Sequence, residues 1–311
     1  MQFRTKITIP ISEQPIDYSS RIVTLGSCFA VNIAEKLEYY KFLNSVNPHG
    51  ILFHPVALEN YVSAAVNKKK FSEQDLFFNE GRWHCFDAHS DVSDSNKDAV
   101  LQKLNNPSVD FSETSHLIIT LGTAWVYRNV DSGCIVANCH KVPQKQFTKE
   151  LLSVESIAKS LQNIIRVVRE KNSSIKIIFT VSPVRHIKDG FVENQISKSH
   201  LITGLHEVVR NTNSASYFPS YEIMMDELRD YRFFAADMIH PNHTAIDYIW
   251  QRFTETYLTA DALSVMREVE GIQRAISHRP FSPDTDSHKA FLKNVARKIS
   301  ELQKRHPHIA F

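Results

Sequence analysis

Between residues 21 and 30 the chain reads Arg21-Ile22-Val23-Thr24-Leu25-Gly26-Ser27-Cys28-Phe29-Ala30. The run from Ile22 to Leu25 has the composition of a strand that is covered on both faces. Gly26 permits a tight turn, and a helix that starts directly after it directs its first N–H groups toward Ser27. We therefore predict a strand, a turn and a helix, with the Ser27 hydroxyl at the junction.

Other apolar runs extend this pattern along the chain. Residues 117–121 and 175–181 resemble buried strands, and residues 45–47 and 215–218 are shorter candidates. Helical stripes alternate with them, at Ile157, Leu161, Ile164, Ile165 and Val168 and at Leu201, Leu205, Val208 and Val209. The alternation predicts a three-layer α/β/α fold, a doubly wound parallel sheet of about five strands. Such sheets bind ligands at the carboxyl ends of their strands, where Ser27, Gly122 and Arg185 fall.

Asp237-Met238-Ile239-His240 offers the partners that a serine nucleophile needs. A serine hydroxyl is weak until a base removes its proton, and a third group must orient that base. Asn242 suits a helix cap after His240, and Pro241 suits the first turn. Two simpler interpretations stay open at this point: Ser27 as an ordinary N-cap, and His240 as a loop histidine that caps or packs.

Five motifs resemble the GSCFA family, which is grouped with the SGNH/GDSL esterases and lipases. They are Gly-Ser-Cys-Phe-Ala at 26–30, Asn-Pro-His-Gly-Ile-Leu-Phe at 47–53, Thr-Leu-Gly-Thr-Ala-Trp at 120–125, Thr-Val-Ser-Pro-Val-Arg-His at 180–186 and Ala-Asp-Met-Ile-His-Pro at 236–241. The resemblance implies a flavodoxin-like SGNH fold. It also implies that Ser27 is the nucleophile, His240 the general base and Asp237 its orienting group. Ser27 and Gly50 would donate backbone N–H groups to an oxyanion hole.

The sequence departs from the SGNH pattern in two places. Ser27 follows Gly26 directly, where these enzymes usually have Asp, and Gly122-Thr123-Ala124 has Ala where the third block has an oxyanion-binding Asn. Thr123, the Trp125 indole or a backbone amide such as that of Gly122 could replace this donor. Loss of one such donor typically lowers the rate ~10²–10³-fold, so weak activity is compatible with the sequence.

Several other residues are candidates for contact with the substrate. Arg185 could bind a carboxylate or acyl portion together with His186, although a structural salt bridge explains Arg185 equally well. His49 stands either in a pocket wall or in an ordinary turn. Cys28 at the helix start is an alternative nucleophile, but we expect its side chain to turn toward the core.

Composition restricts the function further. There are 36 Lys and Arg against 34 Asp and Glu, so nothing indicates a nucleic-acid or anionic-membrane partner. Neither a secretory signal nor a membrane span is evident, which favours a cytoplasmic protein. Four irregularly spaced cysteines and 15 histidines match no usual zinc spacing, and Gly is only 8 of 311 residues. We expect neither a metal nor another cofactor.

Domain organisation changes near residue 259. Residues 1–258 form the predicted hydrolase domain, and residues 259–311 have only helical periodicity. This helical appendage either packs on the main domain or mediates homo-oligomer formation. A segment with Phe77, Phe78, Trp83 and Phe86 is expected to form an inserted hairpin or loop that could shape a lid or simply be core.

We expect a serine hydrolase that cleaves an oxygen ester through an acyl-enzyme. An O-acetyl group on a carbohydrate or small metabolite is the substrate that the family resemblance suggests. Two alternatives remain: an O-acyltransferase with the same triad, and a weakly active ligand-binding protein on the same fold.

Overall fold

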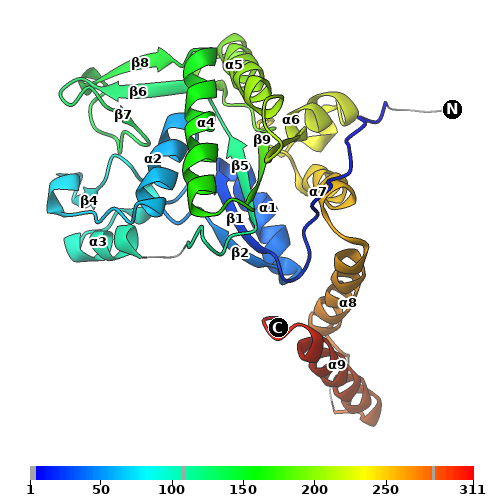
Figure 1. Ribbon diagram of the computed structural model, residues 1–311. Coiled ribbons are helices and arrows are strands. Elements are labelled where there is room, and N and C mark those ends of the chain that lie inside the picture. Colours follow the sequence, from blue (N-terminus) through cyan, green and yellow to red (C-terminus); the bar gives the residue numbers. More distant parts are fainter. Residues whose placement is uncertain (1–4, 107–108, 282–283) are drawn as a thin grey trace.

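A computed structural model describes residues 5–106, 109–281 and 284–311. Its centre is a parallel sheet of five strands in the order β10-β9-β5-β1-β2 (Figure 1). The strands are β1 (Arg21–Gly26), β2 (Leu43–Val46), β5 (His116–Leu121), β9 (Lys176–Val181) and β10 (Ala215–Phe218). The predicted sheet is confirmed, with β2 displaced by one or two residues from the expected 45–47.

Two helical layers cover the sheet. Helices α1 (Cys28–Tyr39) and α7 (His243–Tyr257) lie on one face, where Phe29, Ile33, Ile249 and Phe253 pack with Ile22, Ile118 and Ile178. Helices α2 (Pro55–Val66), α4 (Val154–Lys171) and α5 (Phe191–Val209) lie on the other face, where Leu58, Leu161 and Leu205 pack with Val23, Leu117 and Ile177. Alternate residues of each strand therefore enter opposite cores, as parallel strands covered on both faces require.

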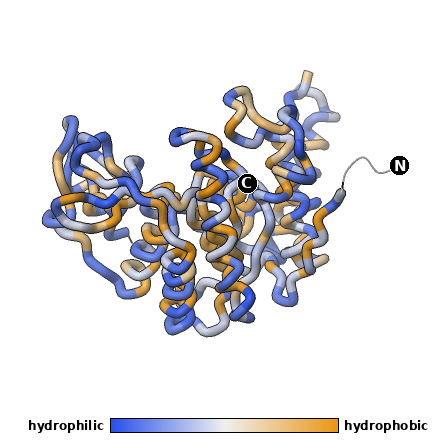
Figure 2. The backbone as a smooth tube through the Cα atoms, turned by 90° about the horizontal axis from the view of Figure 1, so that it is seen from above, coloured by the Kyte–Doolittle hydropathy of each residue, from blue (hydrophilic) through white to orange (hydrophobic). Residues whose placement is uncertain are grey.

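Figure 2 shows hydrophobic residues in the centre of the molecule, where sheet and helices meet, and mainly hydrophilic residues in the peripheral loops. The helix starts agree with the sequence signals in part. The Asn242 side chain caps α7 by accepting from Ala245 N, as expected. Pro241 lies before this helix rather than in its first turn, where we had expected it.

Two insertions interrupt the succession of sheet strands along the chain, one between β2 and β5 and one between β5 and β9. The predicted hairpin is confirmed as β3 (Phe77–Asn79) and β4 (Arg82–His84), followed by α3 (Lys97–Asn105). The antiparallel sheet of β6 (Trp125–Asn129), β7 (Ile135–Val136) and β8 (Phe147–Leu151) was not predicted. Short helical segments complete the chain: α6 (Ser220–Glu222), a π-helix at Ile223–Glu227, and 3-10 turns at Glu73–Asp75, Ser90–Val92, Gln144–Gln146, Ile187–Asp189 and Tyr231–Phe233.

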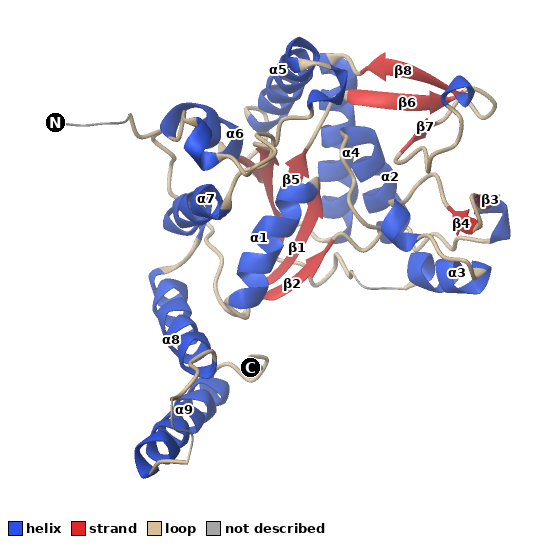
Figure 3. Cartoon of the chain, turned by 180° about the vertical axis from the view of Figure 1, so that it is seen from behind, coloured by secondary structure: helices blue, strands red, loops and turns tan. Residues whose placement is uncertain are grey.

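The C-terminal part consists of α8 (Ala260–Ile276) and α9 (Asp286–Arg305), which extend away from the sheet (Figure 3). The chain end nevertheless returns to the main body, because Tyr18 stacks on Phe42 and lies against the ring of His306. Arg305 also pairs with Glu268, which joins α9 to α8. The expected helical appendage is thus present and contacts the main body.

Candidate active site

Ser27 lies between β1 and α1, directly after a turn at Gly26 whose backbone conformation requires glycine. Gly26 has φ +130°, and a Cβ placed on it would lie 2.1 Å from the Thr120 carbonyl oxygen of β5. Ser27 follows with extended backbone at the N-cap of α1. The position predicted for the nucleophile therefore rests on two strands at the centre of the sheet.

The Ser27 hydroxyl has no hydrogen-bond partner. Ser27 is 0% exposed, its side chain does not cap α1, and its Oγ is buried without an acceptor or donor among the described residues. A buried polar group without a partner destabilises a protein by about 1–3 kcal/mol. The ordinary N-cap interpretation is therefore wrong, and the hydroxyl is free for another role.

Asp237 and His240 form the predicted pair. The Asp237 Oδ2 lies 2.7 Å from His240 Nδ1, and Asp237 Oδ1 accepts from the backbone N–H groups of His240 and Ile239. These hydrogen bonds, with the two backbone donors contributing most, lower the pKa of Asp237 to about 2. The carboxylate can only accept, so His240 Nδ1 donates, and Nε2 is the ring nitrogen that could serve as a base.

The structure does not join His240 to Ser27, because the Ser27 Oγ has no partner. The surrounding loops nevertheless meet at the carboxyl ends of the strands. The Arg185 N–H, after β9, donates to the Ile239 carbonyl at 3.2 Å. The His186 ring lies 5.7 Å from that of Phe53, and the Phe53 Cδ1 would lie 3.3 Å from a Cβ placed on Gly122. A Cβ on Gly122 would also lie 3.1 Å from the Ser27 Cβ.

The four predicted oxyanion donors are all engaged with protein carbonyls. Ser27 N donates to Thr120 O at 3.1 Å and Gly50 N to Asn47 O at 2.7 Å. Gly122 N and Thr123 N both donate to Phe53 O, at 2.8 and 3.0 Å. The predicted oxyanion hole is therefore not formed in this structure. The Phe53 carbonyl occupies the place between two adjacent amides that an oxyanion would take.

The side chains considered as replacements for the missing Asn are engaged as well. Thr123 Oγ1 lies 3.1 Å from Ser197 Oγ and accepts from Trp125 N, while the Trp125 indole donates to the Glu193 carbonyl at 3.1 Å. Ala124 is buried, and its N–H donates to Ser197 Oγ. In this arrangement neither Thr123 nor Trp125 offers a free donor beside Ser27.

Arg185 and His186 border the site in different ways. The Arg185 guanidinium lies over the rings of Phe234 and Tyr231, at 4.1 and 5.1 Å, and no described carboxylate pairs with it. The salt-bridge alternative is therefore wrong within the described residues. His186 has a buried Nε2 without a partner. Burial, with the nearby charges of Lys198 and His240, lowers the pKa of His186 to about 3, so its ring is neutral.

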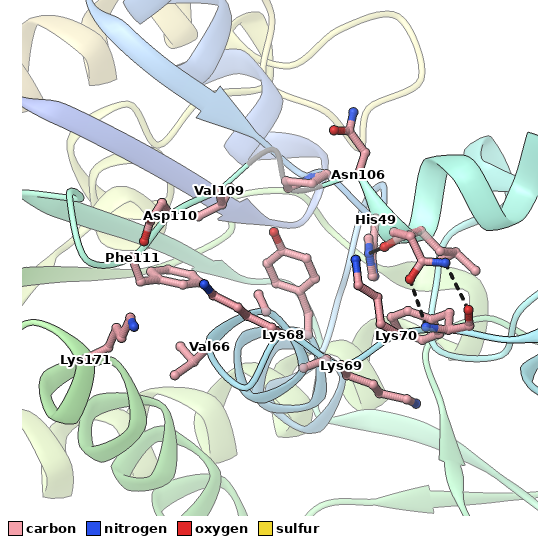
Figure 4. A pocket seen from close by; sticks show the side chains of 17 residues that line it. His49, Val66, Lys68, Lys69, Lys70, Asn106, Val109, Asp110, Phe111 and Lys171 are labelled. Atoms are coloured by element: carbon pink, nitrogen blue, oxygen red, sulfur yellow. Dashed lines mark hydrogen bonds between the residues drawn. The ribbon is translucent and has the colours of Figure 1, made fainter.

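His49 belongs to another cavity, shown in Figure 4. Its ring lies against Tyr61 and Phe71, and its Nε2 lies 3.0 Å from the Leu104 carbonyl. This cavity, of about 290 Å³, includes Lys68, Lys69, Lys70 and Lys171 but not Ser27. The structure therefore does not place the His49 side chain in the Ser27 site, because the turn after β2 directs it into this separate cavity.

Cys28 behaves as a packed side chain. It lies against the core shared by α1 and α7, and burial raises the pKa of its thiol despite the nearby Lys198 charge. The alternative of an activated Cys28 thiolate is not supported. All four cysteines are free thiols. No group of three His, Cys, Asp or Glu side chains suited to a metal occurs within residues 5–106, 109–281 and 284–311.

A family model named GSCFA family matches residues 21–253, which is most of the chain. The chain belongs to the GSCFA family. A second model, the C-terminal domain of GSCFA domain proteins, matches residues 269–311 and thus covers the last part of α8 and all of α9. No curated protein matches this family member. No helix in the described part of the chain has the length and apolar character that a membrane crossing requires.

The solved structures that resemble this chain have little sequence identity to it. An acetyl xylan esterase (Est2A) from Butyrivibrio proteoclasticus has 10% identity and a TM-score of 0.42, over 77% of this chain and 64% of its own. A candidate platelet activating factor from Streptococcus pneumonia has 9% identity and a TM-score of 0.41, over 78% and 85%. A carbohydrate esterase of family 3 from Talaromyces cellulolyticus has 11% identity and a TM-score of 0.28, over 50% and 60%.

Sequence reasoning missed two residues that shape this site. Phe53, the last residue of the family motif at 47–53, supplies both the carbonyl and the ring beside Gly122. Lys198, three residues before Leu201, lies on the buried stripe of α5. The sequence could have indicated Lys198, because its spacing places it on the same helix face as Leu201 and Leu205, and charged residues seldom occupy an apolar face.

Proposed function

We propose that this protein is a serine hydrolase that cleaves an oxygen ester, with Ser27 as nucleophile. The observation that carries the proposal is the buried, unpartnered Ser27 hydroxyl on its glycine turn. A hydroxyl that neither caps a helix nor bonds to a neighbour destabilises the fold, and a catalytic role accounts for its presence. The Asp237–His240 pair, whose loop contacts the loop after β9, supplies the base.

The reaction proceeds in two steps. Ser27 Oγ attacks the ester carbonyl carbon while His240 Nε2 takes the Oγ proton, and collapse of the tetrahedral intermediate returns that proton to the departing alcohol. Water, activated by the same imidazole, then attacks the acyl-enzyme and releases the acid. Asp237 holds the ring through Nδ1 and stabilises the imidazolium that forms in each step.

A bound substrate must replace the Phe53 carbonyl as the acceptor of two backbone hydrogen bonds. The Phe53 carbonyl now accepts from Gly122 N and Thr123 N. A substrate carbonyl that displaces it would receive the same two donors, provided that the Phe53 segment and the His240 loop move relative to Ser27. Arg185, whose guanidinium has no carboxylate partner in the described chain, borders the entrance and would bind an anionic part of the substrate. An O-acetyl ester of a carbohydrate or small metabolite is the substrate class that we propose to test first.

A second candidate, a ligand-binding protein with little turnover, is favoured by the same Phe53 carbonyl. If that carbonyl stays in place, Ser27 remains buried and the two amides remain unavailable.

Intact-mass detection of a fluorophosphonate adduct separates the two candidates without knowledge of the substrate. We expect one adduct on the wild-type chain and on Cys28→Ala, and none on Ser27→Ala. Absence of an adduct on the folded wild-type protein would favour the binding protein. Loss of the adduct in Cys28→Ala alone would assign the nucleophile to the neighbouring residue.

A further inference from the structure

Lys198 is a lysine whose side chain is completely inside the protein. It is 0% exposed and lies on the face of α5 that also buries Leu201 and Leu205. Its Nζ donates to two backbone carbonyls, those of Gly122 and Ser182, each at 2.8 Å. No carboxylate pairs with it in the described part of the chain. Burying an ammonium group away from any counter-ion is unfavourable, so its presence requires a reason.

The two carbonyls place this ammonium beneath the candidate site. Gly122 directly follows β5 and Ser182 directly follows β9, so Lys198 ties the carboxyl ends of two neighbouring strands together. Gly122 is also the residue that faces the Ser27 Cβ. Beside the larger effect of burial, the charge of Lys198 acts to lower the pKa values of both Cys28, which follows Ser27, and His186, in the loop after β9.

One peptide group connects Lys198 to a predicted oxyanion donor. The Gly122 carbonyl and the Thr123 N–H belong to the same trans peptide, so they point in opposite directions. Lys198 binds the carbonyl end, and the N–H end donates to the Phe53 oxygen at 3.0 Å. A cation on the carbonyl polarises the peptide and strengthens its N–H as a donor. It also fixes the plane of the peptide, and therefore the direction of the N–H.

We propose that Lys198 is a positioning residue of the ester-cleaving site, which orients and polarises the Gly122–Thr123 peptide toward the oxyanion that forms at Ser27. This inference rests on the proposed function. It offers an electrostatic replacement for the Asn that the SGNH pattern has where this chain has Ala124. The ammonium keeps its proton throughout the reaction and acts through the peptide and through its charge.

The proposal predicts a specific pH dependence. The ionisable groups that face Lys198 are Cys28 on α1, His186 in the loop after β9, and Tyr221 on α6, whose ring centre is 5.7 Å from Nζ. Burial lowers the pKa of Lys198 to about 7. A neutral amine can still donate two hydrogen bonds, so deprotonation removes the charge while the contacts remain. The rate should therefore fall as the pH rises above about 7, without unfolding.

The test is the rate at which a fluorophosphonate modifies Ser27, followed by intact mass from pH 6 to 10 with reagent hydrolysis measured in parallel. We expect Lys198→Met to react ~10²-fold more slowly than wild type near pH 7, as for loss of an oxyanion donor, and to lack the alkaline decline. Lys198→Gln, which retains a neutral donor, should also lack the decline. Lys159→Met, which removes an exposed lysine of α4, should react like wild type.

The outcomes separate this inference from the proposed function. A folded Lys198→Met protein with the wild-type rate and pH profile would overturn the role of Lys198 alone. If both Lys198 variants fail to fold, the wild-type profile decides: a decline above about pH 7 supports the role, and a rate that does not decline up to pH 10 overturns it. No adduct on the folded wild-type protein would overturn the proposed function, and this inference with it.

Discussion

Ser27 and His240 lie in parts of the molecule that differ in burial and in the contacts that hold them in place. Ser27 is 0% exposed at the end of a central strand, and β5 fixes its turn. The side chains of Asp237 and His240 are 46% and 48% exposed, on a loop between a 3-10 turn and α7. The proposed nucleophile is thus held by the core of the fold, whereas the proposed base is held mainly by its own loop.

This difference indicates how the site can work. Because the central sheet cannot shift without breaking strand pairing, we expect the position of Ser27 to stay fixed. The exposed loop of His240 and the Phe53 segment are the parts that can adjust around it. Variants of the buried side should therefore change stability, and variants of the exposed side should change the rate with little effect on stability.

The largest effect is expected for Gly26→Ala. The added Cβ would lie 2.1 Å from the Thr120 carbonyl, at a φ of +130° that side chains rarely adopt. We expect a loss of more than ~4 kcal/mol in the free energy of unfolding, measured by urea denaturation. Gly81→Ala is the matched control, since φ there is +77° but nothing lies within 4 Å. It should lose only about 1 kcal/mol. Equal losses in both variants would show that the turn before Ser27 is not sterically fixed.

His240→Ala tests the exposed side of the site. Removal of a general base should lower the rate of ester hydrolysis, or of fluorophosphonate modification, by ~10²–10⁴-fold. The melting temperature should hardly change, because the Asp237–His240 pair is largely solvated. His243→Ala, three residues further on an exposed position, should retain the wild-type rate. If His240→Ala reacts as fast as wild type, His240 is not the base.

Ser27→Ala should have a smaller effect on stability, with a sign that distinguishes the two interpretations of this serine. Removing an unpartnered buried hydroxyl should raise the free energy of unfolding by about 1 kcal/mol. Ser153→Ala is the comparison, because the Ser153 side chain does cap α4 by accepting from Ser156 N. It should lose about 1 kcal/mol. Destabilisation of both variants would return Ser27 to the role of an ordinary cap.

The sequence was sufficient to predict the central sheet, the glycine turn before Ser27 and the Asp237–His240 pair. Continuous apolar runs and the glycine before Ser27 are local signals, and the Asp237–His240 spacing is short enough to form within one loop. Hydrogen bonds between distant segments could not be predicted in this way. The Phe53 carbonyl reaches the amides of Gly122 and Thr123 only through the packing of two loops, and this contact occupies the donors of the predicted oxyanion hole.

The antiparallel sheet of β6, β7 and β8 was missed for a related reason. Its strands are only partly buried and mix apolar with polar residues, and the short β7 strand pairs through only two residues. Such strands depend on partners rather than on composition. His49 shows the same limit, since it belongs to the same family motif as Gly50 and yet its ring is directed into another cavity.

The smallest effect is expected for Arg185→Gln, which tests the residue that lies where the loop after β9 meets the His240 loop. The guanidinium lies on Phe234 and Tyr231 and has no carboxylate partner among the described residues, so it is available for an anionic substrate group. With 4-nitrophenyl hemisuccinate we expect kcat/KM to fall about fivefold, which corresponds to about 1 kcal/mol for a solvated ion pair. With uncharged 4-nitrophenyl acetate it should not change. Arg232→Gln removes a nearby guanidinium that Asp230 already pairs, so it should affect neither ester. Equal losses on both esters in Arg185→Gln would mean that Arg185 supports the His240 loop through packing, and that its charge does not select the substrate.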